Sequence, residues 1–357
     1  MRECTVEMFE PAPVSRPKEA RYYQMEAVSG IQRALLEGHK RIALVLPTGS
    51  GKTLTAALFF SHPGTRKLFN VPGNKKIRVL YAAHLDALLQ QAIREFQSFP
   101  EVELIPQSIY SRIPDHVINN GWDVVCIDEC HHEAMRTYQD KLEILGETPI
   151  IGLTATPDRD DGMLIKFSAI VESLTRVKAV REGYLADSII NTIIDESGPD
   201  KSEILGEIFN TFIKEMGKTL VFVKTHHEAN LINELLRGMG YASVALTTQP
   251  KKFINQVLDQ FSEGEYQFIV NCSKIDEGVD VKGCTDVVLG RNFNSRRQLN
   301  QTIGRAARPD SPCTVWELVD PLKTRVTAID IIKEAKEQRL IFWDYDRKQW
   351  LREKTGS

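Results

Sequence analysis

The stretch Leu46-Pro47-Thr48-Gly49-Ser50-Gly51-Lys52-Thr53 lies between two apolar segments of the first half of the chain. The β-branched run at 41–45 before it is typical of a buried parallel strand, and the run at 54–60 after it is typical of a buried helix. A strand, a glycine-rich turn and a helix in this order indicate a phosphate-binding loop. The glycines let backbone N–H groups close around β- and γ-phosphates, Lys52 adds a positive charge, and the Thr53 hydroxyl is placed to ligate Mg²⁺.

A pair of adjacent acidic residues supports this interpretation. Leu46 replaces the first glycine of the common phosphate-loop pattern, so a flexible loop with a solvated lysine is an alternative for the loop alone. A second buried-strand run at 122–127 ends in Asp128 and Glu129, at the strand tip where α/β sheets bind ligands. Asp128 can hold Mg²⁺ through water, and Glu129 can orient and deprotonate an attacking water. ATP and Mg²⁺ are the expected cofactors.

The composition is that of a soluble globular protein. The chain has 357 residues, enough for two domains, with 42% hydrophobic and 26% charged residues. No apolar run approaches the roughly 18–20 residues of a membrane span, and residues 1–7 lack the core of a signal peptide. The six cysteines form no CxxC pair, so we expect reduced thiols and a cytoplasmic protein, or host cytoplasm if it is phage-encoded. The net charge of −3 neither favours nor excludes a nucleic-acid partner.

A helix is expected to begin at Arg21, with one apolar face that includes Val28 and Ile31. Gln24 carries a donor and an acceptor in one amide, as reading an adenine edge requires, and Arg21 could stack on that base. An ordinary surface glutamine is the simpler alternative for Gln24 considered alone.

Alternating strands and helices predict two doubly wound parallel sheets. In the first half, further strands are expected at 79–83, 105–109 and 149–153. The polar segment 195–200 is the expected linker, and the alternation restarts with strands at 220–223, 268–272 and 286–290. The predicted organisation is an N-terminal arm (1–17), a first domain (18–195), a second domain (196–330) and a C-terminal helical tail (331–357).

The segment Thr225-His226-His227-Glu228 matches a capping box at a helix start, with Thr225 as N-cap and Glu228 reaching back. Adjacent histidines point to different sides of a helix, so we expect solvated residues here rather than metal ligands.

In order and spacing, these motifs resemble the superfamily 2 helicases and translocases of the DExH kind, over roughly residues 18–320. The resemblance rests on Gln24, the phosphate loop, Asp128-Glu129-Cys130-His131, Thr154-Ala155-Thr156, a glycine–aspartate loop and Gln301…Arg308. The stretches 153–157 and 182–185 look most like the branch with restriction-enzyme motor subunits and phage or archaeal DNA repair helicases. The resemblance implies an α/β fold of two tandem RecA-like domains with ATP in the cleft between them.

The resemblance also implies roles for individual residues. Arg305 and Arg308 match arginine fingers, with Gln301 near the γ-phosphate and attacking water. Asp280, in the loop with Gly278, would reach the ribose, and His131, Thr154 and Thr156 would couple hydrolysis to the grip on nucleic acid. The loop residues around the nucleotide would be Pro47, Thr48, Gly49, Ser50, Gly51, Lys52 and Thr53. The residues expected to hold a nucleic-acid backbone are His84, Gln107, Ser108, Lys224 and Ser273.

The sequence thus predicts an ATP-dependent helicase or translocase that remodels forks or short duplexes, with DNA favoured over RNA as its partner and DNA repair as its setting. We expect a monomer that does not associate with membranes. Two alternatives stay open: an RNA helicase, and a motor that translocates, anneals or serves a larger complex without processive unwinding. A phosphate-loop kinase or GTPase would not explain Arg305 and Arg308 in the second half, and intact Lys52, Asp128, Glu129 and Arg308 argue against a scaffold with a degenerate site.

Two further features concern duplex separation and the tail. The segment from 280 to 301 holds one expected strand and a short turn, too little for a β-hairpin wedge, which needs roughly ten more residues. Phe293 in that turn could be a minimal wedge or could pack into the core. The aromatic run 340–345 and Trp350 could stack on bases or dock a partner protein, although packing onto the second domain is favoured.

Overall fold

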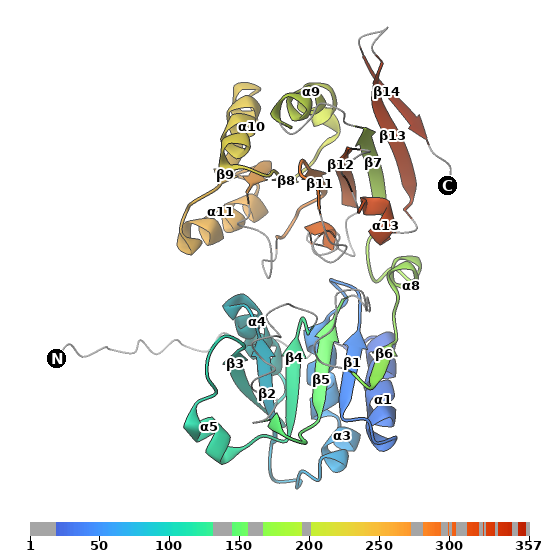
Figure 1. The fold of residues 1–357 in the computed structure, drawn as a ribbon, viewed down its shortest axis with the longest axis vertical. Coiled ribbons are helices and arrows are strands. Elements are labelled where there is room, and N and C mark those ends of the chain that lie inside the picture. Colours follow the sequence, from blue (N-terminus) through green and yellow to red (C-terminus); the bar gives the residue numbers. More distant parts are fainter. Residues whose placement is uncertain are drawn as a thin grey trace, which may run out of the picture. The chain divides into compact units, whose positions relative to one another are not determined.

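The computed structural model describes residues 19–130, 145–155, 167–194, 201–272, 281–293, 299, 302–304, 313–320, 324, 326–332, 335–344 and 349–354. The chain divides into two compact units, residues 1–45 with 51–173, and residues 46–50 with 174–357. Each unit is built on its own sheet, and the parallel sheets that the sequence predicted are confirmed (Figure 1). Across the described ranges, no helix combines the length and apolar character needed to cross a membrane.

The first unit contains a six-stranded sheet in the order β3-β2-β4-β5-β1-β6, with every pairing parallel. The strands are β1 (Arg41–Val45), β2 (Ile77–Ala83), β3 (Val102–Ser108), β4 (Val124–Asp128), β5 (Ile150–Thr154) and β6 (Ala169–Glu172). The central strands β4 and β5 are buried at every residue. Burial on both faces explains why they read as continuous apolar runs in the sequence.

Helices cover both faces of this sheet. They are α1 (Tyr22–Leu36), α2 (Lys52–Ser61), α3 (Pro63–Leu68), α4 (Asp86–Phe96) and α5 (Asp115–Asn120). Helix α2 contacts both α1 and α4, so these three share one face. Val117 and Ile118 of α5 pack into a cluster with Leu80 and Ile127 on the other face. Leu80 and Tyr81 are neighbours on β2 but face opposite layers. Leu80 belongs to the cluster with α5, whereas Tyr81 contacts the ring of Phe96 in α4.

The second unit contains an eight-stranded sheet in the order β14-β13-β7-β12-β11-β8-β10-β9, parallel except for β13 with β14. The strands are β7 (Ser188–Ile194), β8 (Thr219–Phe222), β9 (Ser243–Leu246), β10 (Phe268–Asn271), β11 (Asp286–Leu289), β12 (Cys313–Val319), β13 (Glu337–Asp344) and β14 (Gln349–Lys354). The helical segments are α8 (Arg176–Arg181), α9 (Ser202–Phe212), η2 (Ile213–Glu215), α10 (His226–Gly238), α11 (Lys251–Glu263) and α13 (Ala328–Ile332). One core cluster packs under α9 and α10, and another under α11 and α13.

Local capping signals in the sequence are confirmed. The Thr225 hydroxyl accepts the N–H of Glu228 at 3.1 Å, and the Glu228 carboxylate accepts the N–H of Thr225 at 2.8 Å. This reciprocal pair satisfies donors that the first turn of α10 leaves free.

The start of the second unit differs from the expected boundary at residue 195. Strand β7 pairs with β12 and belongs to the second sheet, and the units divide between Ser173 and Leu174. The glycine and proline near 195–200, which lie outside the described residues, indicated a turn but carried no information about which sheet β7 joins. That choice depends on pairing with β12, more than a hundred residues further on.

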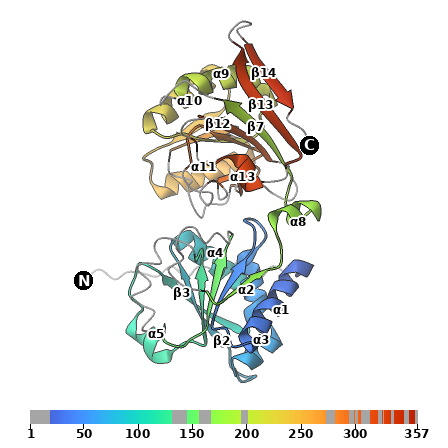
Figure 2. The ribbon, with the colours of Figure 1, turned by 45° about the vertical axis from the view of Figure 1, so that its right-hand side comes forward.

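The expectation of a C-terminal helical tail was wrong. Residues 337–344 (β13) and 349–354 (β14) pair as antiparallel strands, and β13 pairs in parallel with β7 (Figure 2). The β-branched and aromatic content of 340–343 suits a pleated strand, and an open edge at β7 supplies the partner.

The hairpin packs onto the second unit, as favoured for its aromatic residues. Trp350 packs against the cluster under α9. The guanidinium of Arg352 lies 4.7 Å from the ring centre of Phe212 and 5.6 Å from that of Trp316. Arg352 also forms an ion pair with Glu215 at 2.8 Å. The side chain thus fastens β14 to α9 and η2 by stacking as well as by charge.

Replacing Arg352 by Ala should therefore lower the free energy of unfolding of the second unit by about 1–2 kcal/mol, since both ring contacts and the ion pair are lost. Chemical denaturation followed by tryptophan fluorescence measures this loss, because Trp316 reports on the contact.

The matched control is Arg112→Ala. Arg112 pairs with Asp115 at 2.7 Å, but their side chains are 82% and 73% exposed. This exposed pair should change stability by no more than about 0.5 kcal/mol. An equal loss in the two variants would contradict the role given to Arg352.

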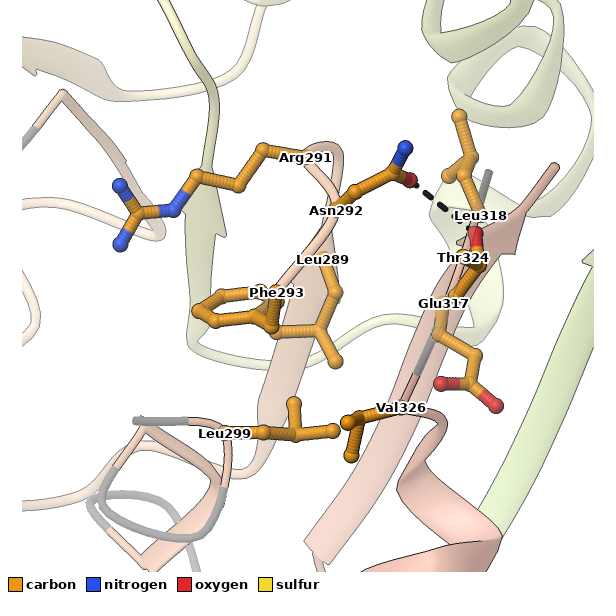
Figure 3. Close-up of a pocket in the computed structure, with 9 residues that line it drawn as sticks. All are labelled: Leu289, Arg291, Asn292, Phe293, Leu299, Glu317, Leu318, Thr324 and Val326. Atoms are coloured by element: carbon orange, nitrogen blue, oxygen red, sulfur yellow. Dashed lines mark hydrogen bonds between the residues drawn. The ribbon is translucent and has the colours of Figure 1, made fainter. Parts of the chain in front are cut away.

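A small cavity of about 10 Å³, with room for about one water molecule, lies at the carboxyl ends of β11 and β12 (Figure 3). Its lining consists of Leu289, Arg291, Asn292, Phe293, Leu299, Glu317, Leu318, Thr324 and Val326. Phe293 is 3% exposed and belongs to the core under α11. The packed alternative for Phe293 is therefore confirmed, and the idea of a Phe293 wedge was wrong.

Glu317 is a buried carboxyl group beside this cavity. It is 3% exposed, its Oε1 accepts the Thr192 hydroxyl at 3.1 Å, and its Oε2 accepts the N–H of Ala328 at 2.6 Å. Burial raises the pKa of Glu317 to about 7, although the two donors oppose the rise. Since the ordinary value is 4.5, the folded state binds the proton more tightly than the unfolded state.

The wild-type protein should therefore lose stability relative to Glu317→Gln as the pH rises from about 4.5 through 7, by at most about 3 kcal/mol. The amide of glutamine stays neutral and keeps an acceptor oxygen. Denaturation midpoints at pH 5 and pH 8 measure the difference, with Glu263→Gln on the exposed side of α11 as the control. Parallel pH profiles for wild type and Glu317→Gln would refute the assignment.

Candidate nucleotide-binding site

The phosphate loop has the backbone that its glycines predicted. Gly49 and Gly51 have φ angles of 85° and 82°, in the left-handed region that favours glycine. Helix α2 begins at Lys52 with Gly51 as its N-cap, and the Ser50 hydroxyl donates to the Pro47 carbonyl at 2.7 Å. The free N–H groups of a helix start directly after such a turn form a site suited to an anion.

Gln24 lies against this loop. It is 2% exposed, its Oε1 accepts the N–H of Arg21 at 2.9 Å, and its Nε2 is 3.1 Å from where a Cβ on Gly51 would lie. The alternative of an ordinary surface glutamine was wrong, while adenine reading by Gln24 stays a prediction. Arg21 is exposed beside it at the start of α1.

The acidic pair, Asp128 and Glu129, lies at the end of β4 next to Lys52. Lys52 Nζ lies 3.6 Å from Glu129 Oε1, and the two side chains are only 10% and 13% exposed. Asp128, at the end of β4, is 6% exposed, and its Oδ1 accepts the N–H of Glu129 at 3.0 Å. Burial, together with the charge of Glu129, raises the pKa of Asp128 to about 6, although Lys52 opposes this shift.

One further residue of the site was not expected from the sequence. Tyr81 is fully buried on β2, and its hydroxyl donates to Asp128 Oδ2 at 2.8 Å. Burial and the nearby Asp128 raise the pKa of Tyr81 well above its usual range, so the phenol keeps its proton. In the sequence, the only signal was a phenol in a strand that otherwise reads as apolar.

The donor set suits Mg²⁺. Thr53, in the first turn of α2, supplies an alcohol oxygen directly after the phosphate loop, and Asp128 supplies a carboxylate next to Glu129, which lies 3.6 Å from Lys52. These are the hard oxygen ligands that Mg²⁺ takes, usually with several waters and substrate phosphates. Two buried neighbouring carboxylates opposite a single lysine would also gain from a divalent cation.

The next strand ends on the same edge. Thr154 is the last residue of β5 and is 1% exposed, and β5 lies between β1 and β4 in the sheet. Thr154 therefore stands at the carboxyl end beside the acidic pair. Its coupling role stays a prediction.

The candidate nucleic-acid contacts of the first unit also lie together. His84 directly follows β2, whose Ala83 pairs with Ser108 at the end of β3. His84 and Gln107 are 7% and 4% exposed, and Gln107 Nε2 donates to the Ser111 hydroxyl at 2.7 Å. This hydrogen bond ties Gln107 of β3 to the loop that follows the strand.

In the second unit, Lys224 is exposed just after β8. Its N–H donates to Glu228 Oε2 at 3.0 Å, which ties the loop to the start of α10 and leaves the lysine side chain in solvent.

The remaining predicted site residues lie outside the described residues. They are His131, Thr156, Ser273, Gly278, Asp280, Gln301, Arg305 and Arg308.

Two family models match the chain. Residues 17–112 and 104–159 match the res subunit of type III restriction enzymes, and residues 200–310 match the helicase conserved C-terminal domain. The first of these matches includes the phosphate loop and the acidic pair.

Several known proteins are similar to this chain in sequence or in structure. The chain is 24% identical to the type I restriction enzyme EcoAI endonuclease subunit of Escherichia coli over 82% of this chain and 44% of that subunit. It is 24% identical to the DNA 3′-5′ translocase XPB2 of Sulfurisphaera tokodaii over 87% of this chain and 83% of that protein. A fragment assigned as the HsdR subunit of a type I restriction enzyme from Vibrio vulnificus superposes with a TM-score of 0.71 at 21% identity, over 93% of this chain and 70% of that one. The chain spans about half the length of the first curated relatives that it matches.

Fold and site together define a phosphate-loop protein with two tandem RecA-like α/β domains. The chain belongs to the superfamily 2 helicases and translocases, as its motifs predicted.

Replacing Gly51 by Ala should weaken ATP binding at least about tenfold, because the left-handed φ strains an alanine and its Cβ would meet Gln24. Equilibrium binding of a fluorescent ATP analogue measures this effect. The matched control is Gly38→Ala, which has a φ of 87° but no atom within 4 Å of the added Cβ. It should lose about 1 kcal/mol of stability and keep its affinity for ATP. Equal affinity in both variants would contradict the loop assignment.

Proposed function

We propose that this chain is an ATP-dependent motor that couples ATP hydrolysis to movement on nucleic acid. The observation that carries the proposal is the contact of Lys52 with Glu129 beside a glycine loop that opens helix α2. A phosphate cradle and a water-activating carboxylate are the two parts that hydrolysis of ATP needs from the first domain.

The chemistry follows from the positions of these side chains. The N–H groups at the start of α2 cradle the β- and γ-phosphates, and Lys52 neutralises their charge. Glu129 orients the attacking water and takes its proton. Thr53 and Asp128 would hold Mg²⁺, which neutralises the charge that develops on the phosphates. Gln24 reads the adenine edge, with Arg21 stacked on the base.

The second domain is proposed to complete the site. Arg305 and Arg308 would act as arginine fingers on the γ-phosphate, with Gln301 near the attacking water. Asp280, following Gly278, would reach the ribose. ATP would then lie in the cleft between the domains, and closure of that cleft would be required for turnover.

DNA is the proposed track. In support, one relative carries the name of a DNA translocase, and another belongs to a restriction enzyme. Each domain would hold the strand by its backbone, so that opening and closing moves the protein along it. The proposed contacts are His84, Gln107, Ser108, Lys224 and Ser273, with His131, Thr154 and Thr156 as coupling residues. A monomer that acts in the cytoplasm, in DNA repair or a related process, is part of this proposal.

A motor without processive unwinding is the second candidate. It is favoured by the segment 281–293, whose described residues hold the single strand β11 and a turn with Phe293 in the core. Strand separation would then be limited to forks or short duplexes, or would depend on a larger complex. Single-turnover unwinding of duplexes of increasing length, with a trap strand, distinguishes the two candidates.

Glu129→Gln should leave ATP affinity within several-fold of wild type and abolish turnover, whereas Lys52→Ala should lose affinity as well. ATPase rates without nucleic acid, with single-stranded DNA, duplex DNA, a fork and RNA measure turnover and identify the track. Near wild-type hydrolysis by Glu129→Gln would refute Glu129 as the base, and rates that no nucleic acid raises would refute the motor.

A further inference from the structure

Tyr81 differs from the other buried aromatic residues near the phosphate loop because its polar end reaches the acidic pair. Its ring packs against Phe96 of α4, with ring centres 5.9 Å apart at 68°. Its side chain is fully buried, and its hydroxyl lies 2.8 Å from Asp128 Oδ2. Packing against Phe96 thus fixes the ring, and the fixed ring holds the hydroxyl at Asp128 Oδ2.

The two oxygens of Asp128 have different partners. Oδ1 accepts the N–H of Glu129 at 3.0 Å, and Oδ2 accepts the Tyr81 hydroxyl. One donor is backbone and the other is a phenol on the neighbouring strand, where β2 and β4 pair in parallel. A carboxylate held at both oxygens cannot rotate about its terminal torsion, which is broad in a free aspartate. The lone pairs of Asp128 that accept neither of these hydrogen bonds therefore point in fixed directions.

We propose that Tyr81 is a positioning residue that orients the Asp128 carboxylate for the divalent cation of a bound magnesium nucleotide. The proposal rests on the nucleotide site proposed above and extends it to a residue that touches neither nucleotide nor reacting atoms.

The geometry favours positioning over simple packing. A phenylalanine at this place would keep the ring contact with Phe96, so packing alone does not require the hydroxyl. The hydroxyl adds a hydrogen bond to Asp128, one of the expected cation ligands, and this bond is what a phenylalanine would lose. Partners of this kind behind a metal ligand typically contribute 10–100-fold in metal affinity.

The test is Tyr81→Phe in the full chain, with binding of a fluorescent ATP analogue titrated at rising Mg²⁺. The Mg²⁺ concentration that gives half of the affinity gain should rise about 10–100-fold, while affinity without Mg²⁺ stays within about twofold of wild type. Tyr241→Phe is the matched control, because Tyr241 also packs edge-on against a phenylalanine, Phe268, in the second unit. It should leave the Mg²⁺ dependence unchanged.

A double-mutant cycle with Asp128→Asn separates positioning from a general loss of structure. If Tyr81 acts through Asp128, adding Tyr81→Phe to Asp128→Asn should not shift the Mg²⁺ dependence further. An unchanged Mg²⁺ dependence in Tyr81→Phe, an equal loss of affinity with and without Mg²⁺, or full additivity in the cycle would each overturn the inference. Failure of the wild-type protein to bind ATP would instead overturn the proposed function.

Discussion

The burial of two adjacent carboxylates at the tip of β4 is the constraint on which the rest of the first domain depends. Asp128 and Glu129 lie next to one lysine, and burial disfavours the charged form of Asp128. The structure compensates with Lys52, the hydroxyl of Tyr81 and the backbone N–H of Glu129. Each of these partners belongs to a different element or turn, so the site holds only if the elements are correctly placed.

The sheet order supplies that placement. Strand β4 lies between β2 and β5, and β5 lies next to β1, which leads into the phosphate loop. Parallel strands bring their carboxyl ends to one edge, so groups from residues 52, 81 and 128 meet although they are distant in sequence. Glu129 itself has a φ of 49°, in the left-handed region, which costs a non-glycine residue about 1–2 kcal/mol. Strain of this kind persists where the surrounding structure fixes it, commonly at functional sites.

Physical differences between segments explain which parts of the fold the sequence predicts. Strands β1, β4 and β5 are apolar runs because both of their faces are buried, and the loop glycines are needed for positive φ, so both signals are local. Strand β7 carries Ser188, Asn191 and Thr192 among its isoleucines, and its identity depends on a partner more than a hundred residues away. Tyr81 was missed for a related reason, since a tyrosine in an apolar run reads as core until the carboxylate opposite its hydroxyl is known.

The second domain reaches its stability by a different route. In the first domain, the feature that lowers the stability of the fold is the buried charge of the site. In the second domain, it is the edge of the sheet at β7. An unpaired parallel edge exposes a row of donors and acceptors. Strand β13 pairs with that row, and β14 turns back antiparallel, with Arg352 stacked on Phe212 and Trp316. Strand β7 also pairs with β12, which follows the proposed arginine fingers in the sequence, so the hairpin supports a strand that is next to β12 in the sheet. A change in the hairpin would therefore disturb the order of the second domain's sheet.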